Sequence, residues 1–297
     1  MNNLLKGAYD LHLHLGPDVL PRKVDDIEMG RRAVESGMAG FAIKNHYSST
    51  AERAANVNKL FPECDAVGCL VLNNSVGGIN PIAAEMAIRM GARIIFMPTT
   101  DGAYEQDMVF NKTPENKLPF WARLIFQMRE EGVVFPGITI MDEDGNLKKN
   151  VLDVLDVIAK HDVALESGHL SQEEVMVLMK EAQARGVKKI IITHVNYPGT
   201  AFSVEQQKQL VEYGAYIEHC YTPWKSGKIS FEETCAQIRA IGPSHVILGT
   251  DLGRADYCFP DDGLLDFCES LIGAGFTEDE VHEMVVTNPR ILLGKED

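Results

Sequence analysis

Short apolar runs alternate with amphipathic segments along the whole chain. Eight of the runs are rich in β-branched residues and almost continuously apolar, as expected of strands that are covered on both faces. They span residues 8–13, 40–44, 66–72, 93–97, 163–166, 189–193, 215–218 and 246–249. Strands that alternate with helices predict a parallel sheet. Eight such units suit an α/β fold of the (β/α)8 TIM-like barrel type, with allowance for local distortion.

Glycines mark the ends of the helical segments. Five segments with helical periodicity span residues 27–36, 82–90, 173–185, 206–213 and 232–241. The glycines that follow them are Gly37, Gly91, Gly186, Gly214 and Gly242. Glycine adopts the left-handed conformation after a helix without a Cβ penalty, so each unit predicts a helix, a cap, a short turn and a strand.

Two segments interrupt this alternation. Residues 133–150 alternate apolar and polar positions around Asp144-Gly145, which predicts a β-hairpin outside the barrel. Residues 98–119 are polar, rich in Pro, Asn, Asp and Thr, and show no clear period. We expect them to form a long loop after a strand, in a position to cover a site.

The composition of the chain limits the kinds of molecule that we expect it to bind. The chain has 297 residues, of which 45% are hydrophobic, and 28 Lys+Arg against 43 Asp+Glu give a net charge of −15. Such a charge disfavours nucleic acid and anionic membrane surfaces. We therefore expect a small-molecule substrate, no nucleic acid and no membrane as partners, and leave open whether the chain forms a homo-oligomer.

The cysteines and the N-terminal segment indicate a compartment. None of the six cysteines forms a C-x-x-C pair, which argues against a disulfide framework and against a thiolate zinc site. The first residues contain no apolar signal core, and no run approaches the ~20 apolar residues of a membrane span. These features predict a cytoplasmic protein with reduced cysteines.

Polar residues gather where the predicted strands end. His12 and His14 lie two residues apart at the end of the first strand, so both face the same side and suit a shared metal ion. The other strand ends carry His46, Glu166 with His169, His194, Glu218 with His219, and Asp251. In a parallel barrel these ends open on one face.

A metal centre explains this set better than chance. Buried His, Glu and Asp side chains carry a desolvation cost that pairing or a metal offsets. Imidazole and carboxylate ligands without thiolate suit Zn²⁺, and also Mn²⁺, Fe²⁺ or Ni²⁺. Two alternatives stay open here: Glu218 could face inward in place of His219, and Lys44 could form a charge pair with Asp10 or Asp251.

These motifs together resemble the amidohydrolase superfamily of metal-dependent hydrolases. The resemblance rests on D-L-H-L-H at residues 10–14, Glu166, I-I-I-T-H ending at His194, E-H at His219, G-T-D at Asp251, and the N-P-R-I-L-L-G tail at residues 288–294. The motifs extend over almost the whole chain, which favours a single barrel domain over residues 1–297.

The resemblance implies a role for each motif residue. His12 and His14 would bind the more buried metal, Glu166 would bridge, His194 and His219 would hold a second metal, and Asp251 would be ligand and general base. His169 is an alternative to Glu166 as the bridging ligand. Glu166 falls on the fifth predicted strand, whereas the superfamily's bridging residue is usually on the fourth.

The expected function is that of a metal-dependent hydrolase with one or two divalent ions, zinc first. A metal-activated water would attack a small-molecule amide, cyclic amide, lactone or ester bond. Substrate-binding candidates beside the ligands are Lys44, His46, Tyr221 and Arg254. The alternatives are a phosphoester hydrolase and a single-metal decarboxylase of the same superfamily.

Overall fold

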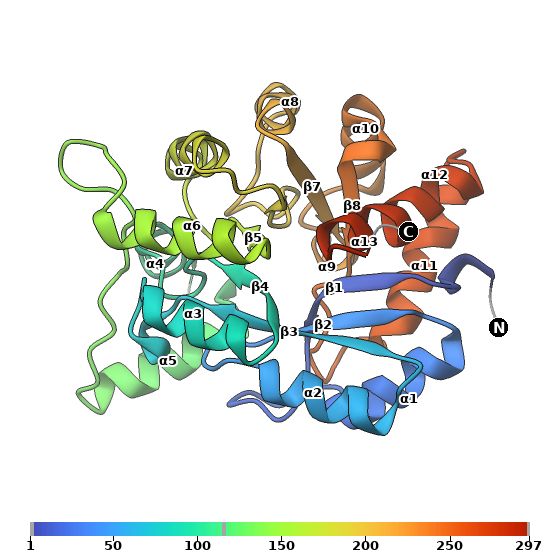
Figure 1. The fold of residues 1–297 in the computed structure, drawn as a ribbon, viewed down its shortest axis with the longest axis horizontal. Coiled ribbons are helices and arrows are strands. Elements are labelled where there is room, and N and C mark those ends of the chain that lie inside the picture. The colour runs from blue at the N-terminus through green and yellow to red at the C-terminus, as the bar shows by residue number, and fades with distance from the viewer. Residues whose placement is uncertain (1–2, 115–116, 296–297) are drawn as a thin grey trace.

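Eight parallel strands form the centre of the molecule. The structure is a computed structural model that describes residues 3–114 and 117–295, and its strands follow the order β1 to β8 (Figure 1). They are β1 Tyr9–His14, β2 Gly40–Lys44, β3 Asp65–Val71, β4 Ala92–Phe96, β5 Ala164–Glu166, β6 Ile190–Ile192, β7 Ala215–Cys220 and β8 Val246–Gly249. All eight predicted strands are therefore confirmed, close to their predicted bounds.

β1 is hydrogen-bonded to the segment that follows β8, and this contact closes the sheet into a barrel. The His14 N–H donates to the Leu252 carbonyl (2.8 Å), and the Asp251 N–H donates to the His12 carbonyl (2.9 Å). Gly253 makes this approach feasible, because a Cβ there would lie 2.1 Å from the His14 carbonyl oxygen. The predicted (β/α)8 TIM-like barrel is confirmed, and the two strand ends that carry His12 and Asp251 are neighbours.

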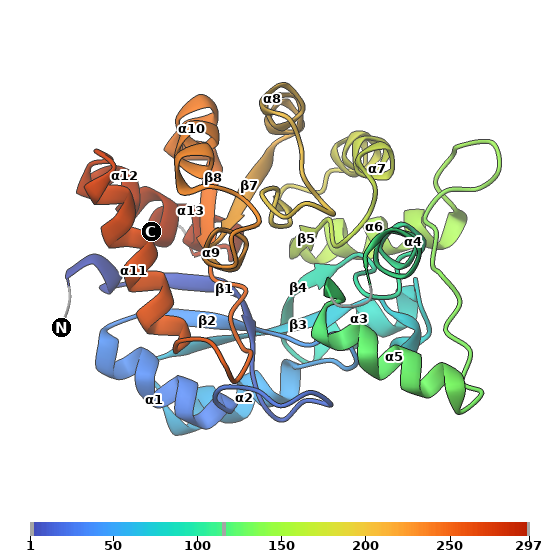
Figure 2. The same ribbon diagram turned by 180° about the vertical axis from the view of Figure 1, so that it is seen from behind.

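Helices surround the barrel (Figures 1 and 2). They are α1 Asp26–Ser36, α2 Ala51–Leu60, α3 Pro81–Arg89, α4 Ala103–Lys112, α5 Phe120–Glu130, α6 Lys149–His161, α7 Gln172–Ala184, α8 Val204–Glu212, α9 Tyr221–Lys225, α10 Phe231–Ile241, α11 Pro260–Gly273, α12 Glu278–His282 and α13 Asn288–Leu292. The five predicted helices are α1, α3, α7, α8 and α10, and the glycine after each has a positive φ. No helix among the described residues is both long and apolar enough to cross a membrane.

Apolar side chains pack in two layers. The inner layer lies within the barrel and includes Leu11, Ile94 and Ile247, while the outer layer joins the strands to the helices. Leu292, at the end of α13, packs with the inner layer, and the Asn288 side chain donates to the Val246 carbonyl (2.7 Å) at the start of β8. The tail motif thus covers the end of the barrel at which the strands begin. The polar residues lie at the opposite end, where the strands have their carboxyl ends.

The prediction of a structureless loop over residues 98–119 is wrong in part, because α4 occupies its centre. Phe110 on α4 stacks edge-to-face with Phe126 on α5, with ring centroids 4.9 Å apart, and Arg129 lies 4.3 Å from the Phe110 ring centroid. These contacts stabilise a helix whose own sequence has no clear period, which is a case of tertiary packing overriding local propensity.

The predicted hairpin is confirmed around its turn only. Met141 and Leu147 form an antiparallel bridge, and the Asp142 N–H donates to the Asn146 carbonyl (2.8 Å). This loop projects from the barrel at the upper left of Figure 1. The chain before it runs differently, since Ile138 pairs in parallel with Gly102 and so connects the segment to the loop after β4.

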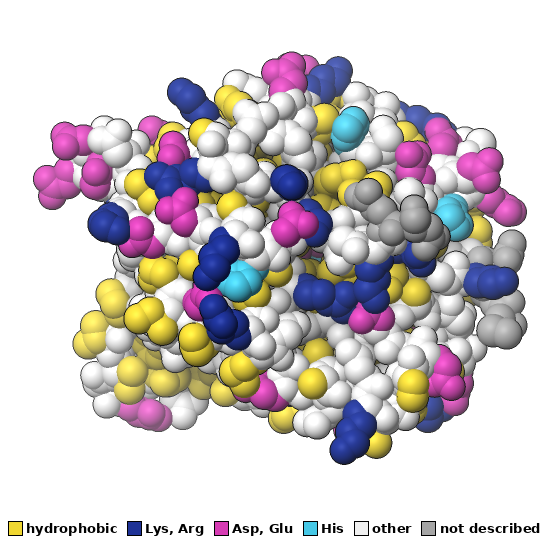
Figure 3. Space-filling view, viewed as in Figure 1, with side chains coloured by type: hydrophobic (Ala, Val, Ile, Leu, Met, Phe, Trp, Pro, Cys, Tyr) yellow, Lys and Arg dark blue, Asp and Glu magenta, His cyan; other side chains and the backbone are white. Residues whose placement is uncertain are grey.

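One helix exposes an apolar stripe. Ile82, Met86 and Met90 recur every four residues along α3 and its end, and Ile82 is 72% exposed. Apolar side chains gather at the lower left of Figure 3, over α3 and α5. Self-association through this or another face stays a prediction.

Candidate metal centre

A β-bulge in β1 orients the two histidines of the first motif. The register of β1 against β2 shifts between Asp10 and Leu13. Within this stretch the consecutive residues Leu11 and His12 both face the barrel interior, where Leu11 packs in the inner layer and His12 contacts Glu218. The buried Asp10 carboxylate accepts from the His12 N–H (3.0 Å) and from the Thr250 hydroxyl (2.6 Å). Burial raises the pKa of Asp10 to about 7. Asp10 therefore connects β1 to β8 and positions the residues beside it.

His12, His14 and Asp251 converge on one point. Asp251 Oδ1 lies 3.3 Å from His12 Nε2 and 3.2 Å from His14 Nε2, and the ligand atoms of the three residues all lie within 4.8 Å of one another. Burial lowers the pKa of His14 well below its usual value, so the imidazole is neutral, which is the form that binds metal. Burial acts to raise the pKa of Asp251, but its contacts with His12 and His14 outweigh burial and hold the pKa well below the usual value, so the carboxylate is ionised.

The backbone at Asp251 is held in a rarely used conformation. Its φ of +52° lies in the left-handed region, which Asp tolerates better than most residues do. The Thr222 hydroxyl donates to Asp251 Oδ2 (3.0 Å), so the second carboxylate oxygen is also oriented. Strain of this kind persists where the surrounding structure fixes it, often at functional sites.

Glu218, rather than His219, contacts the histidines. Glu218 Oε2 accepts from His12 Nδ1 (2.8 Å) and from the His194 N–H (2.9 Å). Its register partner is the inner-layer residue Ile247, whereas His219 pairs with the outer-layer residue Leu248. Both ring nitrogens of the buried His219 lack a hydrogen-bond partner among the residues that the structure describes. The strand alternation thus turns Glu218 toward the site and His219 away from it.

The contact with Glu218 sets the tautomer of His12. A proton on Nδ1 that donates to the carboxylate leaves the Nε2 lone pair free for a cation, the arrangement typical of metal-binding histidines. Burial acts to raise the pKa of Glu218, but His12 outweighs it and lowers the pKa below its usual value. Glu218 is therefore an ionised acceptor that orients His12.

Replacing Glu218 is expected to weaken metal binding without removing a ligand. We expect Glu218→Gln to lower zinc affinity about 10- to 100-fold, as measured by equilibrium dialysis of the folded protein. His219→Gln is the matched control on the same strand and should leave the affinity unchanged. A larger loss in His219→Gln than in Glu218→Gln would place the ligand at His219 and contradict this assignment.

Five of the six predicted strand-end histidines form a histidine cluster. Its members are His12, His14, His46, His169 and His194, with adjacent ring centroids 4.8–6.2 Å apart. His169 Nε2 lies 3.1 Å from His194 Nε2, and His194 Nδ1 lies 2.8 Å from the Thr200 hydroxyl. Burial lowers the pKa of His194 and of His46 well below the usual value. The cluster can therefore offer several neutral nitrogen ligands.

Glu166 lies buried at the end of β5. Its Oε2 accepts from the Thr193 hydroxyl (3.0 Å), and its Oε1 has no partner among the described residues. Burial raises the pKa of Glu166 well above its usual value. An unpartnered carboxylate oxygen of this kind costs free energy unless a cation satisfies it.

Lys44 supplies the positive charge among these carboxylates. Its Nζ lies 2.7 Å from His12 Nε2 and 4.9 Å from the Phe96 ring centroid, and the side chain is buried. The ammonium thus stands beside the nitrogen that a metal would use. A cation fits this place, because the neutral imidazole of His14 and the ionised Asp251 face it. The charge of Lys44 also lowers the pKa of Glu166, though less than burial raises it.

Two of the predicted substrate-binding residues lie elsewhere. The Tyr221 hydroxyl donates to Asp266 (2.6 Å), and its ring packs on Trp224 outside the barrel. Arg254 is exposed and pairs with Asp256 (2.7 Å). In contrast, His46 stacks on His14 with ring centroids 4.8 Å apart, and Lys44 contacts His12, so these two predicted residues do join the cluster.

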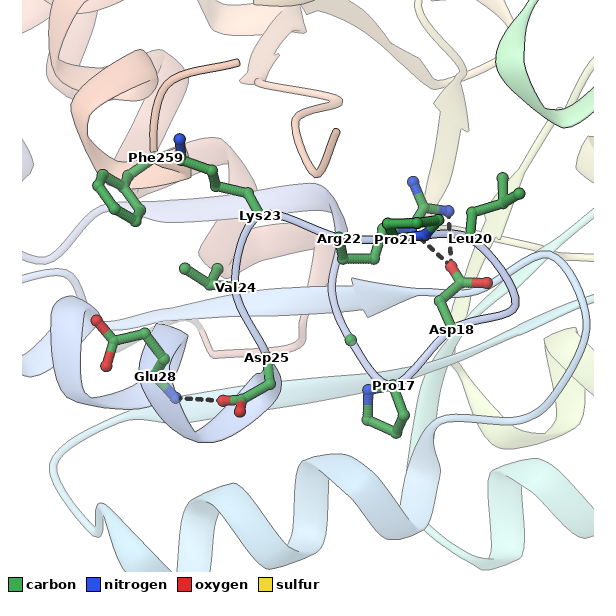
Figure 4. A pocket seen from close by; sticks show the side chains of 11 residues that line it. Pro17, Asp18, Leu20, Pro21, Arg22, Lys23, Val24, Asp25, Glu28 and Phe259 are labelled. Carbon is green, nitrogen blue, oxygen red and sulfur yellow. Dashed lines mark hydrogen bonds and ion pairs between the residues drawn. The ribbon is translucent and has the colours of Figure 1, made fainter. Parts of the chain in front are cut away.

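A cavity lies along the loop between β1 and α1. It measures about 640 Å³ and is lined by loop residues 16–18 and 20–25 together with Glu28 and Phe259 (Figure 4). Arg22 in this loop bonds Asp18 (Nε to Oδ2, 2.7 Å), as Figure 4 shows. The positive charge of Arg22 lowers the pKa of His14 and His46, though less than burial does, so the loop lies close to the cluster.

Solved structures with the same fold include several from the superfamily that the sequence resembles. An amidohydrolase from Pseudomonas aeruginosa is 12% identical with a TM-score of 0.64, over 98% of this chain and 97% of that one. A lactonase from Listeria monocytogenes is 14% identical with a TM-score of 0.54, over 99% and 97%. A phosphotriesterase homology protein from Escherichia coli, with phosphate in its active site, is 14% identical with a TM-score of 0.56, over 97% and 99%.

These likenesses confirm the resemblance to the amidohydrolase superfamily at the level of the fold. The chain itself belongs to a family of unknown function, DUF6282, whose model matches residues 7–218. No curated protein matches the sequence. The matched family segment contains every member of the histidine cluster as well as Glu166 and Glu218.

Proposed function

We propose that this protein is a metal-dependent hydrolase of a small-molecule amide, cyclic amide, lactone or ester bond. The convergence of His12, His14 and Asp251 carries the proposal, because two buried imidazoles, of which that of His14 is neutral, face an ionised carboxylate and form a cation site. When bound there, a divalent cation lowers the pKa of water and polarises a carbonyl oxygen. Zinc is the first candidate, with manganese, iron and nickel as alternatives.

Side chains of the protein would carry out the proton transfer and would orient the ligands. Asp251, ionised and oriented by Thr222, is placed to accept a proton from an attacking water and return it to the leaving group. Glu218 holds the tautomer of His12. The contact between His12 and Glu218 is fully buried, which strengthens it electrostatically.

A second cation would use the other half of the cluster. Glu166 offers an unpartnered oxygen, and His169 and His194 face one another through Nε2 at 3.1 Å. His169 follows β5 and His194 follows β6, so both lie on the same face of the barrel as His12. We therefore propose His169 and His194, with Glu166 between the two sites, as the ligands of a second ion.

Cysteine is not proposed as a ligand. Cys220 lies 4.0 Å from His12 Nδ1, but burial raises the pKa of its thiol well above the usual value, so it stays protonated. All six cysteines are free, which fits the expected reducing, cytoplasmic setting that we retain as a proposal.

The test combines metal content with a substrate screen. The purified protein should carry one or two divalent ions per chain, and it should hydrolyse at least one compound from panels of amides, lactones and esters. Chelation should abolish turnover, and zinc should restore it. Turnover confined to phosphoesters or to decarboxylation would favour the alternative reactions, and a metal-free protein with full turnover would refute the proposal.

A further inference from the structure

A lysine and a tyrosine lie together beside the histidine cluster. Lys228 follows α9, and its Nζ lies 2.7 Å from the Tyr197 hydroxyl oxygen and 3.9 Å from the Tyr197 ring centroid. The Tyr197 ring in turn lies 5.3 Å from the imidazole of His194, centroid to centroid. The pair therefore brings an ammonium group and a hydroxyl group to the edge of the cluster.

Lys228 differs from Arg22 and Arg254, each of which pairs with a carboxylate. Arg22 pairs with Asp18, and Arg254 pairs with Asp256. Within residues 3–114 and 117–295, no carboxylate lies within ion-pair distance of Lys228. Its charge is thus left for a group that comes from outside the chain.

Lys228 lies within electrostatic range of Asp251. Partial desolvation lowers the pKa of Lys228, while the negative charges of Asp251 and Glu105 act to raise it. Glu105 lies 3.6 Å from His169 Nδ1, on the far side of the cluster from His12. An anion held by Lys228 would therefore lie within the electrostatic reach of both Asp251 and the His169–His194 pair.

We infer that Lys228 and the Tyr197 hydroxyl bind a carboxylate carried by the substrate, so that the substrate is an anionic amide or lactone. The inference rests on the proposed hydrolase function and specifies the substrate class of the same site. It adds a specificity determinant on the loop after β7 to the ligands at the strand ends.

The donor geometry favours a carboxylate. The Tyr197 hydroxyl accepts from Lys228 and can at the same time donate its own proton to an anion. One ammonium and one hydroxyl offer a donor to each of the two oxygens of a carboxylate. A phosphate, with more oxygens and more charge, is usually met by Arg or by several donors.

The test uses a matched pair of probes on the metal-loaded protein. N-acetylglycine carries a carboxylate, and N-acetylglycinamide is its neutral counterpart. We expect the wild-type protein to bind the acid about 10-fold more tightly by calorimetry, as one charge-assisted contact allows. Lys228→Met should abolish this preference and leave the affinity for the neutral amide unchanged, and Tyr197→Phe should reduce it.

Lys225→Met is the matched control. Lys225 is the last residue of α9, three positions before Lys228, but it pairs with Asp266 and lies over the Trp224 ring (4.1 Å). This variant should keep the wild-type preference. On a hydrolysed carboxylate substrate, Lys228→Met should raise KM while kcat is retained.

Three results would overturn the inference. They are equal or absent binding of the two probes by the wild type, a preference that survives in Lys228→Met, and tighter binding of inorganic phosphate than of N-acetylglycine that Lys228→Met abolishes. Hydrolysis of neutral amides with no preference for the acid would refute this inference alone. A lack of metal and turnover, with the preference intact, would refute the hydrolase function instead.

Discussion

A His12→Ala/His14→Ala variant is expected to fold and to lose both bound metal and turnover. The two imidazoles supply the nitrogen atoms that face Asp251, at 3.3 and 3.2 Å, so their removal leaves one carboxylate at this point. The loss in metal affinity should exceed the ~10- to 100-fold expected for a residue that only orients a ligand. Elemental analysis after dialysis measures it, and circular dichroism verifies the fold.

The control for this variant is a second pair of histidines. His245 and His282 are exposed and lie outside the histidine cluster, so His245→Ala/His282→Ala should keep its metal and its turnover. Full metal content in the His12→Ala/His14→Ala protein would show that the cation lies elsewhere in the molecule.

Asp251→Asn is expected to lower kcat by about 10²- to 10⁴-fold, the usual contribution of a general acid–base group. Asparagine is neutral and isosteric, and it also tolerates the left-handed backbone conformation that Asp251 adopts at a φ of +52°. The variant should therefore fold normally and retain much of its metal through His12 and His14. Steady-state kinetics on the substrate found by screening, together with metal analysis, separates the two effects.

Asp256→Asn provides the comparison on the same loop. Asp256 is exposed and pairs with Arg254, so its loss should leave kcat unchanged. Near-normal turnover in Asp251→Asn would mean that a different group accepts the proton, and the role assigned to Asp251 would be withdrawn.

The barrel could be predicted because each strand–helix unit is indicated by residues that are close together in the sequence. A short apolar run, an amphipathic segment and a glycine such as Gly37 or Gly186 recur along the chain, and each signal depends on neighbouring residues alone. The helix α4 could not be found this way. It is stabilised by the stacking of Phe110 on Phe126, a contact between residues that are separate in the sequence.

The site residues that lie at the ends of strands could be predicted from the sequence. The six histidines at strand ends were identified from the sequence, and five of them meet in the cluster. Which of Glu218 and His219 faces inward depends on the register of β7, because both side chains are buried and composition does not distinguish them.

Residues on loops were harder to assign. Tyr221 stands next to a strand end, but its hydroxyl is held by Asp266 on α11, a partner 45 positions away. Lys228 and Tyr197 come together from two different loops, and no spacing in the sequence signals that contact.

The central claim is that His12, His14 and Asp251 hold a divalent cation. The most direct measurement is anomalous X-ray diffraction from crystals of the protein loaded with zinc, at wavelengths on either side of the zinc absorption edge. We expect an edge-dependent peak between the side chains of those three residues. A fully loaded crystal whose only zinc peak lies outside the cluster would contradict it.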